Sequence, residues 1–214
     1  MELQKLKNVA IIVAHPDDET LWAGGTMMSN PSWKCYVVCL CRKSDQDRAP
    51  RFFKALTVLG ATGIMGDLND GPEQIPLKDN DVQEMIKRLI PDLMYDLVIT
   101  HNPDGEYTRH LRHEEISRAV INLWAKGLIA AKQLWTFAYE DGHKSHYPKP
   151  QVNADFYHIL EQRVYDLKYN IITLTYGFEK SSWEAKTTPQ NEAFWYFPNP
   201  VKAMQWVAKG GAAS

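Results

Sequence analysis

The sequence predicts an α/β fold with a mainly parallel central sheet and helices on both of its faces. Short apolar runs rich in β-branched residues alternate with segments of helical periodicity along the chain. The first run, 8–14 (NVAIIVA), is apolar without interruption after Asn8, as in a strand whose two faces are both covered. The length of 214 residues suits one core. We therefore expect residues 1–214 to form a single domain.

The first half of the chain alternates strand and helix. After the strand at 8–14, helical spacing runs from about Asp18 to Ser29, and 34–41 (KCYVVCLC) predicts a second buried strand. Residues 48–60 predict a helix that Gly60 ends, because glycine readily takes the left-handed conformation at a helix C-terminus. Residues 79–90 predict a further helix, which stops before Pro91.

The second half continues the alternation. Residues 96–100 (DLVIT) predict a third strand, 114–126 an amphipathic helix and 132–139 another strand. A strand at 154–160 then leads into a helix at about 161–173. Right-handed crossovers between parallel strands place helices on both faces. Ligands bind such folds beyond the carboxyl ends of the strands, so the residues after 8–14 and after DLVIT are the first candidates for a site.

Residues 177–214 form an aromatic-rich C-terminal extension. The segment could wrap the domain, line a pocket or contact a second copy of the chain. The sequence is therefore compatible with either a monomer or a homo-oligomer.

Composition narrows the class of protein. The net charge of −2 gives no global attraction for nucleic acid or an anionic membrane. No stretch is long enough to span a bilayer, and the first residues lack the pattern of a signal peptide, so we expect a cytoplasmic protein. The spacing of Cys35, Cys39 and Cys41 within one apolar run predicts buried small side chains rather than disulfides or a zinc knuckle.

Two clusters of metal-ligand residues follow predicted strands. His15-Pro16-Asp17-Asp18-Glu19 comes directly after 8–14, and His110-Leu111-Arg112-His113 comes after the loop that follows DLVIT. A hydrolytic zinc site needs three protein ligands and one open position. His15 and Asp18 can come from one turn, and His113 can complete the set. Asp17, next to a ligand but free of the metal, is placed as a general base.

Each cluster also has a simpler interpretation. Asp17 and Asp18 could cap a helix, and His110 and His113 could lie on a solvated helix face. Two such clusters at the same edge of the sheet favour the metal site.

These motifs resemble those of the PIG-L (LmbE-like) family of zinc-dependent N-deacetylases. The resemblance covers most of residues 1–140, and its first motif is highly specific. The shared features are HPDDE with the following Gly24-Gly25, the helix end at Leu59-Gly60, the Asn69-Asp70-Gly71 turn, and Gly105-Glu106-Tyr107 before the later H-x-x-H. The resemblance implies a Rossmann-like α/β sandwich.

The resemblance also implies roles for individual residues. His15, Asp18 and His113 correspond to the zinc ligands, Asp17 to the general base, and His110 to the residue that, when protonated, stabilises the tetrahedral intermediate. Either Asp17 or His110 could protonate the leaving amine. Arg48 and Asp70 correspond to positions that contact substrate, and Glu19 would orient a ligand or the loop. Tyr107 is a further candidate for substrate binding from its own position, because it precedes the H-x-x-H motif and could reach an oxyanion or a sugar hydroxyl.

The sequence departs from the family pattern in three places. The second motif usually has proline and an acid or amide between its histidines, whereas this chain has Leu111 and Arg112, and Arg112 either brings a positive charge to the site or points away from it. Pro50 stands where a glutamate is usual, and the spacing from Tyr107 to His110 is one residue longer. The metal residues are intact, so these departures concern the substrate.

We therefore expect a hydrolase that removes an N-acetyl group from N-acetylglucosamine or a related small glycoconjugate. The cofactor would be Zn²⁺, and Fe²⁺ suits the same ligands. Two alternatives stay open: another single-metal hydrolase, and a non-catalytic protein that binds metal and sugar. A Rossmann dehydrogenase is disfavoured, because no G-x-G-x-x-G follows the first strand.

Overall fold

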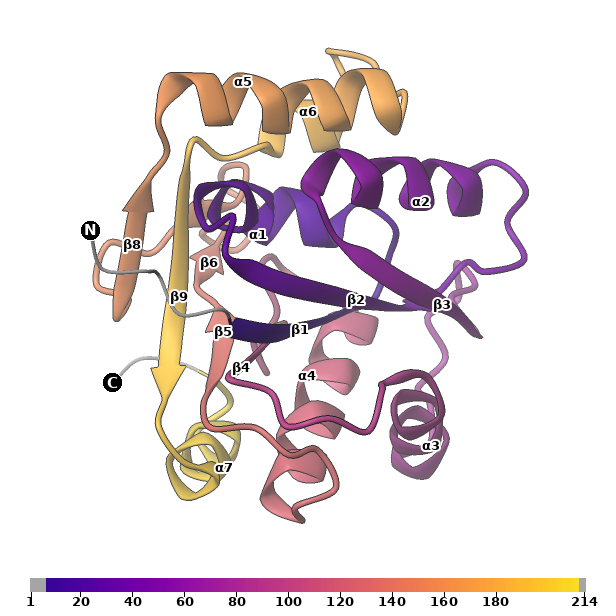
Figure 1. Cartoon of the computed structure of the whole chain (residues 1–214), viewed down its shortest axis with the longest axis vertical. Helices are drawn as coiled ribbons and strands as arrows, with labels where there is room; N and C mark the ends of the chain where they lie inside the picture. The colour runs from indigo at the N-terminus through magenta and orange to yellow at the C-terminus, as the bar shows by residue number, and fades with distance from the viewer. Residues whose placement is uncertain (1–6, 212–214) are drawn as a thin grey trace.

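The centre of the molecule is a seven-stranded sheet with the order β3-β2-β1-β4-β5-β9-β8 (Figure 1). It is seen in a computed structural model that describes residues 7–211. The strands are β1 (Lys7–Val13), β2 (Trp33–Cys41), β3 (Thr62–Leu68), β4 (Leu97–Thr100), β5 (Leu134–Phe137), β8 (Phe156–Ile159) and β9 (Asn191–Phe197). The first five are parallel, whereas β9 is antiparallel to β5 and β8 is antiparallel to β9. The expected mainly parallel α/β fold is confirmed.

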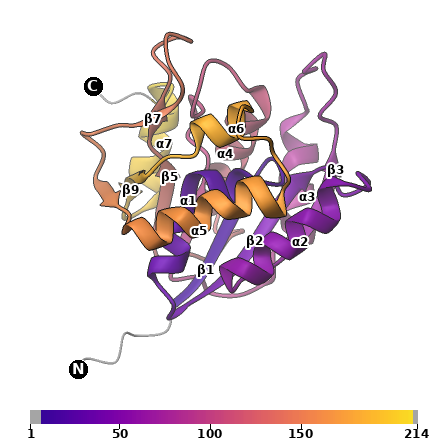
Figure 2. The same ribbon diagram turned by 90° about the horizontal axis from the view of Figure 1, so that it is seen from above.

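Helices cover both faces of this sheet. They are α1 (Asp18–Ser29), α2 (Arg48–Leu59), α3 (Asp79–Leu89), α4 (Leu111–Ala125), α5 (Gln162–Asn170), α6 (Trp183–Thr187) and α7 (Pro200–Ala208), with a π-helical turn η1 (Ile171–Thr175) after α5. One layer holds α1, α2, α5 and α6, and the opposite layer holds α3, α4 and α7 (Figures 1 and 2). A short ribbon of β6 (Tyr139–Glu140) and β7 (Lys149–Pro150) stands apart from the sheet. None of the helices described in 7–211 is long and apolar enough to cross a membrane.

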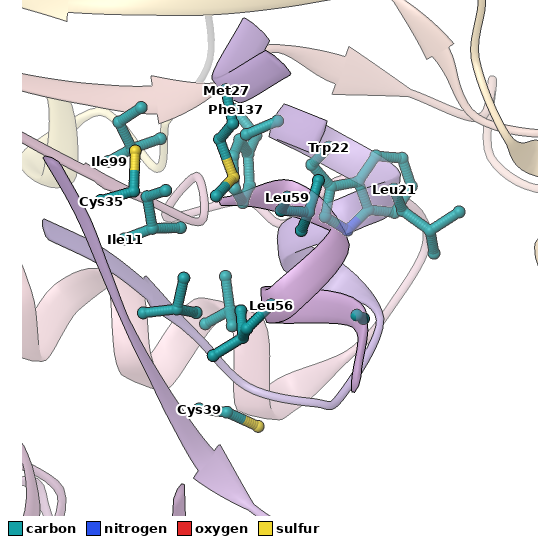
Figure 3. Packing of buried hydrophobic residues seen from close by; sticks show 14 of the residues in the cluster. Ile11, Leu21, Trp22, Met27, Cys35, Cys39, Leu56, Leu59, Ile99 and Phe137 are labelled. Carbon is teal, nitrogen blue, oxygen red and sulfur yellow. The ribbon is translucent and has the colours of Figure 1, made fainter. Parts of the chain in front are cut away.

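The central strand β1 explains why its sequence shows no alternation. Ile11 packs in the layer with α1 and α2, whereas Ile12 packs against the α3 and α4 side, and both are fully buried. Figure 3 shows the first of these layers, where Trp22 of α1 and Leu56 of α2 lie over the sheet. The cysteines belong to this core: Cys35, Cys39 and Cys41 are all buried and unpaired, as the sequence predicts.

Two strands of the seven-stranded sheet are absent from the sequence prediction. The strand β3 contains Gly63 and Gly66, which interrupt its apolar pattern. Gly63 is required by packing, because a Cβ there would lie 2.3 Å from the carbonyl oxygen of Val37. The strand β9 lies in the aromatic tail and buries Phe194 and Trp195 on opposite faces of the sheet. The expected C-terminal extension thus contributes to the core within its described residues, 177–211.

The strand order places a crevice beside the two motifs. From β1 the chain moves to β2 on one side, whereas from β4 it moves to β5 on the other. β1 and β4 therefore flank the point where the strand order reverses, which is where ligands bind in such folds. Residues 15–19 follow β1, and residues 101–113 follow β4.

Candidate metal centre and its pocket

The turn between β1 and α1 is strained and held from behind. Asp17 has φ = 127°, which is unfavourable for a residue with a side chain. Its carbonyl accepts the N–H groups of Thr20 and Leu21 (2.9 and 2.8 Å), and its own N–H donates to Glu19 Oε2 (3.2 Å). Glu19 is fully buried, and its other oxygen accepts the hydroxyl of Tyr176 (2.7 Å). Glu19 therefore supports the loop and does not contact a candidate ligand's ring.

Asp18 directs one carboxylate oxygen toward two histidines. The Trp22 indole N–H donates to Oδ1 (3.1 Å), which fixes the orientation of the carboxylate. Oδ2 lies 3.2 Å from His15 Nδ1 and 3.4 Å from His113 Nε2. Although burial opposes the charge, the imidazoles of His113 and His101 hold the pKa of Asp18 well below its ordinary value. An ionised oxygen thus faces two ring nitrogens.

These atoms form a nearly equilateral triangle. His15 Nδ1 lies 3.3 Å from His113 Nε2, so the three sides measure 3.2, 3.3 and 3.4 Å. Ligand atoms bound at 2.0–2.1 Å to a tetrahedral ion are about 3.3 Å apart. The spacing of His15, Asp18 and His113 thus fits zinc, and it also suits other small divalent ions with the same ligands.

A buried carboxylate fixes the histidine from α4. His113 Nδ1 lies 2.6 Å from Glu106 Oε2. Burial opposes ionisation of Glu106, but the charges and hydrogen bonds of His101 and His113 outweigh it and lower its pKa to about 2. An ionised carboxylate only accepts, so Nδ1 must donate, and Nε2 keeps its lone pair for a metal. In the sequence, Glu106 stands out only as part of the Gly105-Glu106-Tyr107 motif. The signal for its role is an acid a few residues before the H-x-x-H.

His101 makes the same kind of contact but is less suited to bind metal. Ligand atoms of Asp18, His101 and His113 lie within 4.8 Å of one another, as do those of His15, His110 and His113. The Ala14 N–H, however, donates to His101 Nε2 (3.0 Å), and His101 Nδ1 lies 2.9 Å from Glu106 Oε2. Both of its nitrogens are therefore used within the protein.

Asp17 lies beside the triangle with an arginine nearby. Arg48 Nη1 is 3.4 Å from Asp17 Oδ2, and its guanidinium lies over the ring of Phe178, 4.6 Å from the centroid. Burial and the charge of Asp18 raise the pKa of Asp17 well above its ordinary value, with Arg48 partly opposing them. A carboxylate with a raised pKa is a stronger base.

His110 stands at the N-cap of α4, directly over the triangle. Its ring centroid is 4.5 Å from that of His113 and 4.6 Å from that of His15. Burial, with the charges of His113 and His15, lowers its pKa to about 3. We expected a protonated His110, and this environment instead favours the neutral ring. Its buried Nδ1 has no hydrogen-bond partner among the described residues.

The third side of the site is closed by the loop after β3. Asp70 Oδ1 lies 3.3 Å from His15 Nε2, and Asp70 Oδ2 accepts from Arg42 Nη2 (2.7 Å). Asp70 was expected to contact substrate. Its carboxylate also lies beside Nε2 of His15, the ring nitrogen that is not part of the triangle.

Arg112 lies under this loop and points away from the triangle. It is fully buried, and its guanidinium donates to the carbonyls of Asn69 (2.6 Å) and Ile75 (2.7 Å) and to Glu115. Arg112 of the second motif therefore adds no charge to the site. Its hydrogen bonds hold the loop that carries Asp70 in place.

A cavity of about 230 Å³ opens over these groups. It is lined by His15, Pro16, Asp17, Asp18, Leu21, Arg42, Arg48, Asp70, Tyr107, His110, Trp183 and Glu184. The structure thus brings the expected residues Arg48, Asp70 and Tyr107 to one cavity with the motif residues. The aromatic-rich tail was expected to wrap the domain, line a pocket or contact a second copy, and Trp183 was not singled out within it. Trp183 lines this cavity, and its ring packs edge-on against Tyr107 (4.8 Å between centroids).

Comparison with known proteins gives a family and several relatives. The model of the PIG-L family, described as GlcNAc-PI de-N-acetylase, matches residues 10–124. The uncharacterised protein L374 of Acanthamoeba polyphaga mimivirus is 25% identical over 146 residues, which cover 61% of each chain. The 1D-myo-inositol 2-acetamido-2-deoxy-alpha-D-glucopyranoside deacetylase of Corynebacterium glutamicum is 26% identical over 159 residues, which cover 55% of each chain. The chain thus spans about three fifths of the length of the mimivirus protein and just over half of the length of the Corynebacterium deacetylase.

Two solved structures share the fold. The N,N'-diacetylchitobiose deacetylase of Pyrococcus horikoshii superposes with a TM-score of 0.67 at 16% identity, covering 90% of this chain and 84% of its own. The 4-carboxy-2-hydroxymuconate hydratase of Pseudomonas putida gives 0.63 at 17% identity, covering 90% and 97%. These two enzymes are named for different reactions, so the likeness shows the architecture alone.

Proposed function

The chain belongs to the PIG-L family, whose model matches more than half of its residues, and from this premise we propose that it is a metal-dependent N-deacetylase of small N-acetylated amino sugars. The observation that carries the proposal is the triangle of His15 Nδ1, Asp18 Oδ2 and His113 Nε2, with the Asp17 carboxylate beside it in the same cavity. Three ligands with one open side are typical of a hydrolytic rather than a structural metal site.

His15, Asp18 and His113 would hold the metal. A zinc ion bound there would supply Lewis acidity toward an acyl oxygen and would make a water molecule easier to deprotonate. Iron(II) accepts the same two imidazoles and one carboxylate, so we propose Zn²⁺ or Fe²⁺.

Asp17 is assigned the proton transfers. Its raised pKa lets it take a proton from the attacking water and later return it to the departing amine. His110, with its pKa lowered to about 3, is a poor source of that last proton. We therefore assign both transfers to Asp17.

His110 is assigned the developing negative charge. A neutral imidazole donates one hydrogen bond, and the Nδ1 atom without a partner shows that the ring is not committed to a protein group on that side. Its ring lies against those of His15 and His113 and lines the cavity, so it is placed to donate to an acyl oxygen bound beside the proposed ligands.

The substrate class rests on cavity size and on the relatives. A cavity of about 230 Å³ suits a group of the size of one sugar ring and is smaller than most drug-sized pockets, which are roughly 300–1,000 Å³. The Corynebacterium relative is named for a 2-acetamido-2-deoxy-glucopyranoside. We propose an N-acetylglucosamine unit as the part that enters.

Metal analysis and a turnover assay test this proposal together. The purified protein should contain about one zinc or iron per chain, and it should release acetate and a free amine from N-acetylglucosamine derivatives. If the protein binds metal but releases acetate from none of the N-acetylglucosamine derivatives tested, the non-catalytic alternative is favoured. Failure to bind zinc or iron after reconstitution would refute the proposed centre.

A further inference from the structure

One short segment outside the family-matched residues contacts residues in or around the site three times. The segment 176–183 (YGFEKSSW) follows η1. Each of its three aromatic residues contacts a residue in or next to the site. Tyr176 donates its hydroxyl to Glu19 (2.7 Å). Phe178 lies under the Arg48 guanidinium. Trp183 packs against Tyr107.

The last of these residues is held firmly although it is exposed. Trp183 begins α6, where the side chain of Ser182 accepts the N–H of Ala185 (3.1 Å) and thereby caps the helix. Ala185 and Thr187 are buried and anchor the same turn. Trp183 itself remains 37% exposed, so this large apolar ring has a fixed position and an uncovered surface.

That uncovered ring borders the cavity over the metal residues. The cavity lining includes the largely apolar side chains of Leu21, Tyr107 and Trp183, of which the last two are in contact, and the charged side chains of Arg48 and Glu184. A ligand that packs against the apolar groups and also bonds to the charged groups needs an apolar face and hydroxyl groups at its edge. A pyranose ring has both, because its axial C–H groups form an apolar face and its hydroxyls lie around the perimeter.

We propose that Trp183 is a specificity-determining residue that packs against the pyranose ring of the N-acylated amino sugar while the acetamide reaches the metal residues. Glu184, the next residue of α6, would accept hydrogen bonds from ring hydroxyls. This inference rests on the proposed deacetylase function. It adds that recognition of the sugar depends on 176–184, outside the residues 10–124 that the family model matches.

The experiment compares a ring substrate with an acyclic one. Methyl N-acetylglucosaminide carries the sugar ring, whereas N-acetylethanolamine keeps the acetamide and one hydroxyl without a ring. Replacing Trp183→Ala should raise KM for the glycoside at least about tenfold while kcat changes little, because lost ring packing weakens binding before the reaction. KM for the acyclic acetamide should stay the same, and Trp183→Phe should recover part of the loss.

Trp33→Phe and Trp33→Ala serve as matched controls. Trp33 is a partly buried tryptophan at the start of β2, at the opposite end of the sheet from the site, and it does not line the cavity. These two variants should keep the KM values of the wild type. An equal loss on both substrates in Trp183→Ala would show a structural role for Trp183 and would overturn the proposal.

Binding separates this inference from the function on which it rests. The dissociation constant of methyl N-acetylglucosaminide is measured by calorimetry in the Asp17→Asn protein, with and without Trp183→Ala. A dissociation constant about tenfold higher in the double variant supports the sugar-binding role even if the wild type releases no acetate. No measurable binding of the glycoside, or equal binding in both proteins, overturns it.

Discussion

Glu106 and His113 are joined by a hydrogen bond of 2.6 Å between the carboxylate Oε2 and the ring Nδ1, both out of reach of solvent. The same oxygen lies 2.9 Å from His101 Nδ1, and the other carboxylate oxygen accepts the N–H of Asn102 (2.9 Å). One buried acid therefore sets the tautomers of two histidines. Since His113 is a proposed ligand, Glu106 orients the metal site without touching the metal.

Glu106→Gln should weaken zinc binding by about 10- to 100-fold. The amide has the shape of the carboxylate, but it carries no charge and has only one acceptor oxygen, so it cannot accept from the two imidazoles and from the Asn102 N–H together. Affinity is measured by competition with a chelator of known strength. Glu140→Gln, at an exposed acid of the β6–β7 ribbon, serves as the control. An unchanged dissociation constant for zinc in Glu106→Gln would refute the positioning role.

Asp17→Asn should retain the metal and lose turnover by about 10²- to 10⁴-fold, the usual contribution of a general base. Asparagine tolerates positive φ better than most residues, so the strained turn at φ = 127° should survive. Acetate release and metal content are measured on the same sample, with the exposed Asp81→Asn as control. Turnover close to that of the wild type, with metal bound, would remove Asp17 from the mechanism.

Arg112→Met should destabilise the fold by about 3–5 kcal/mol, because it leaves the buried Glu115 carboxylate and two carbonyls without their donor. Glu115→Gln in the same chain should restore part of the loss, since it removes the unpaired charge. Urea unfolding of the two single variants and the double variant gives the coupling energy. Strictly additive losses would show that this ion pair does not fasten the loop to α4.

The sequence predicted the parts of this site that are local and left out those that depend on packing. The turn after β1 could be read directly, because a buried strand followed by HPDDE restricts both the backbone and the chemistry. The direction of Arg112 could not, since its partners Asn69 and Ile75 lie in a loop about forty residues away along the chain. Trp183 could not be singled out from the other aromatics of the tail, because its neighbour in the cavity, Tyr107, is also far away along the chain. The glycines of β3 hid a strand, because they are required by close packing and not by apolar periodicity.

Glu19 should make the metal-free protein less stable as the pH rises through neutrality. Burial raises its pKa from 4.5 to about 7, despite the hydrogen bonds from Thr20 and Tyr176. A carboxyl group with a raised pKa binds more protons in the folded than in the unfolded state between these two values. Stability is therefore full below about pH 4.5 and falls as the pH rises toward 7, by about 3 kcal/mol in all.

Glu19→Gln isolates this contribution. Its amide can donate to the two hydroxyl oxygens while its carbonyl accepts the Asp17 N–H, so the turn is kept and the titration is lost. We expect the free energy of unfolding of the wild type, minus that of Glu19→Gln, to decrease from pH 5 to pH 8 when both are measured in urea with a chelator present. A difference that stays constant or increases with pH would mean that Glu19 is ionised in the folded protein throughout. Its support of the Asp17 turn would then be that of a charged acceptor.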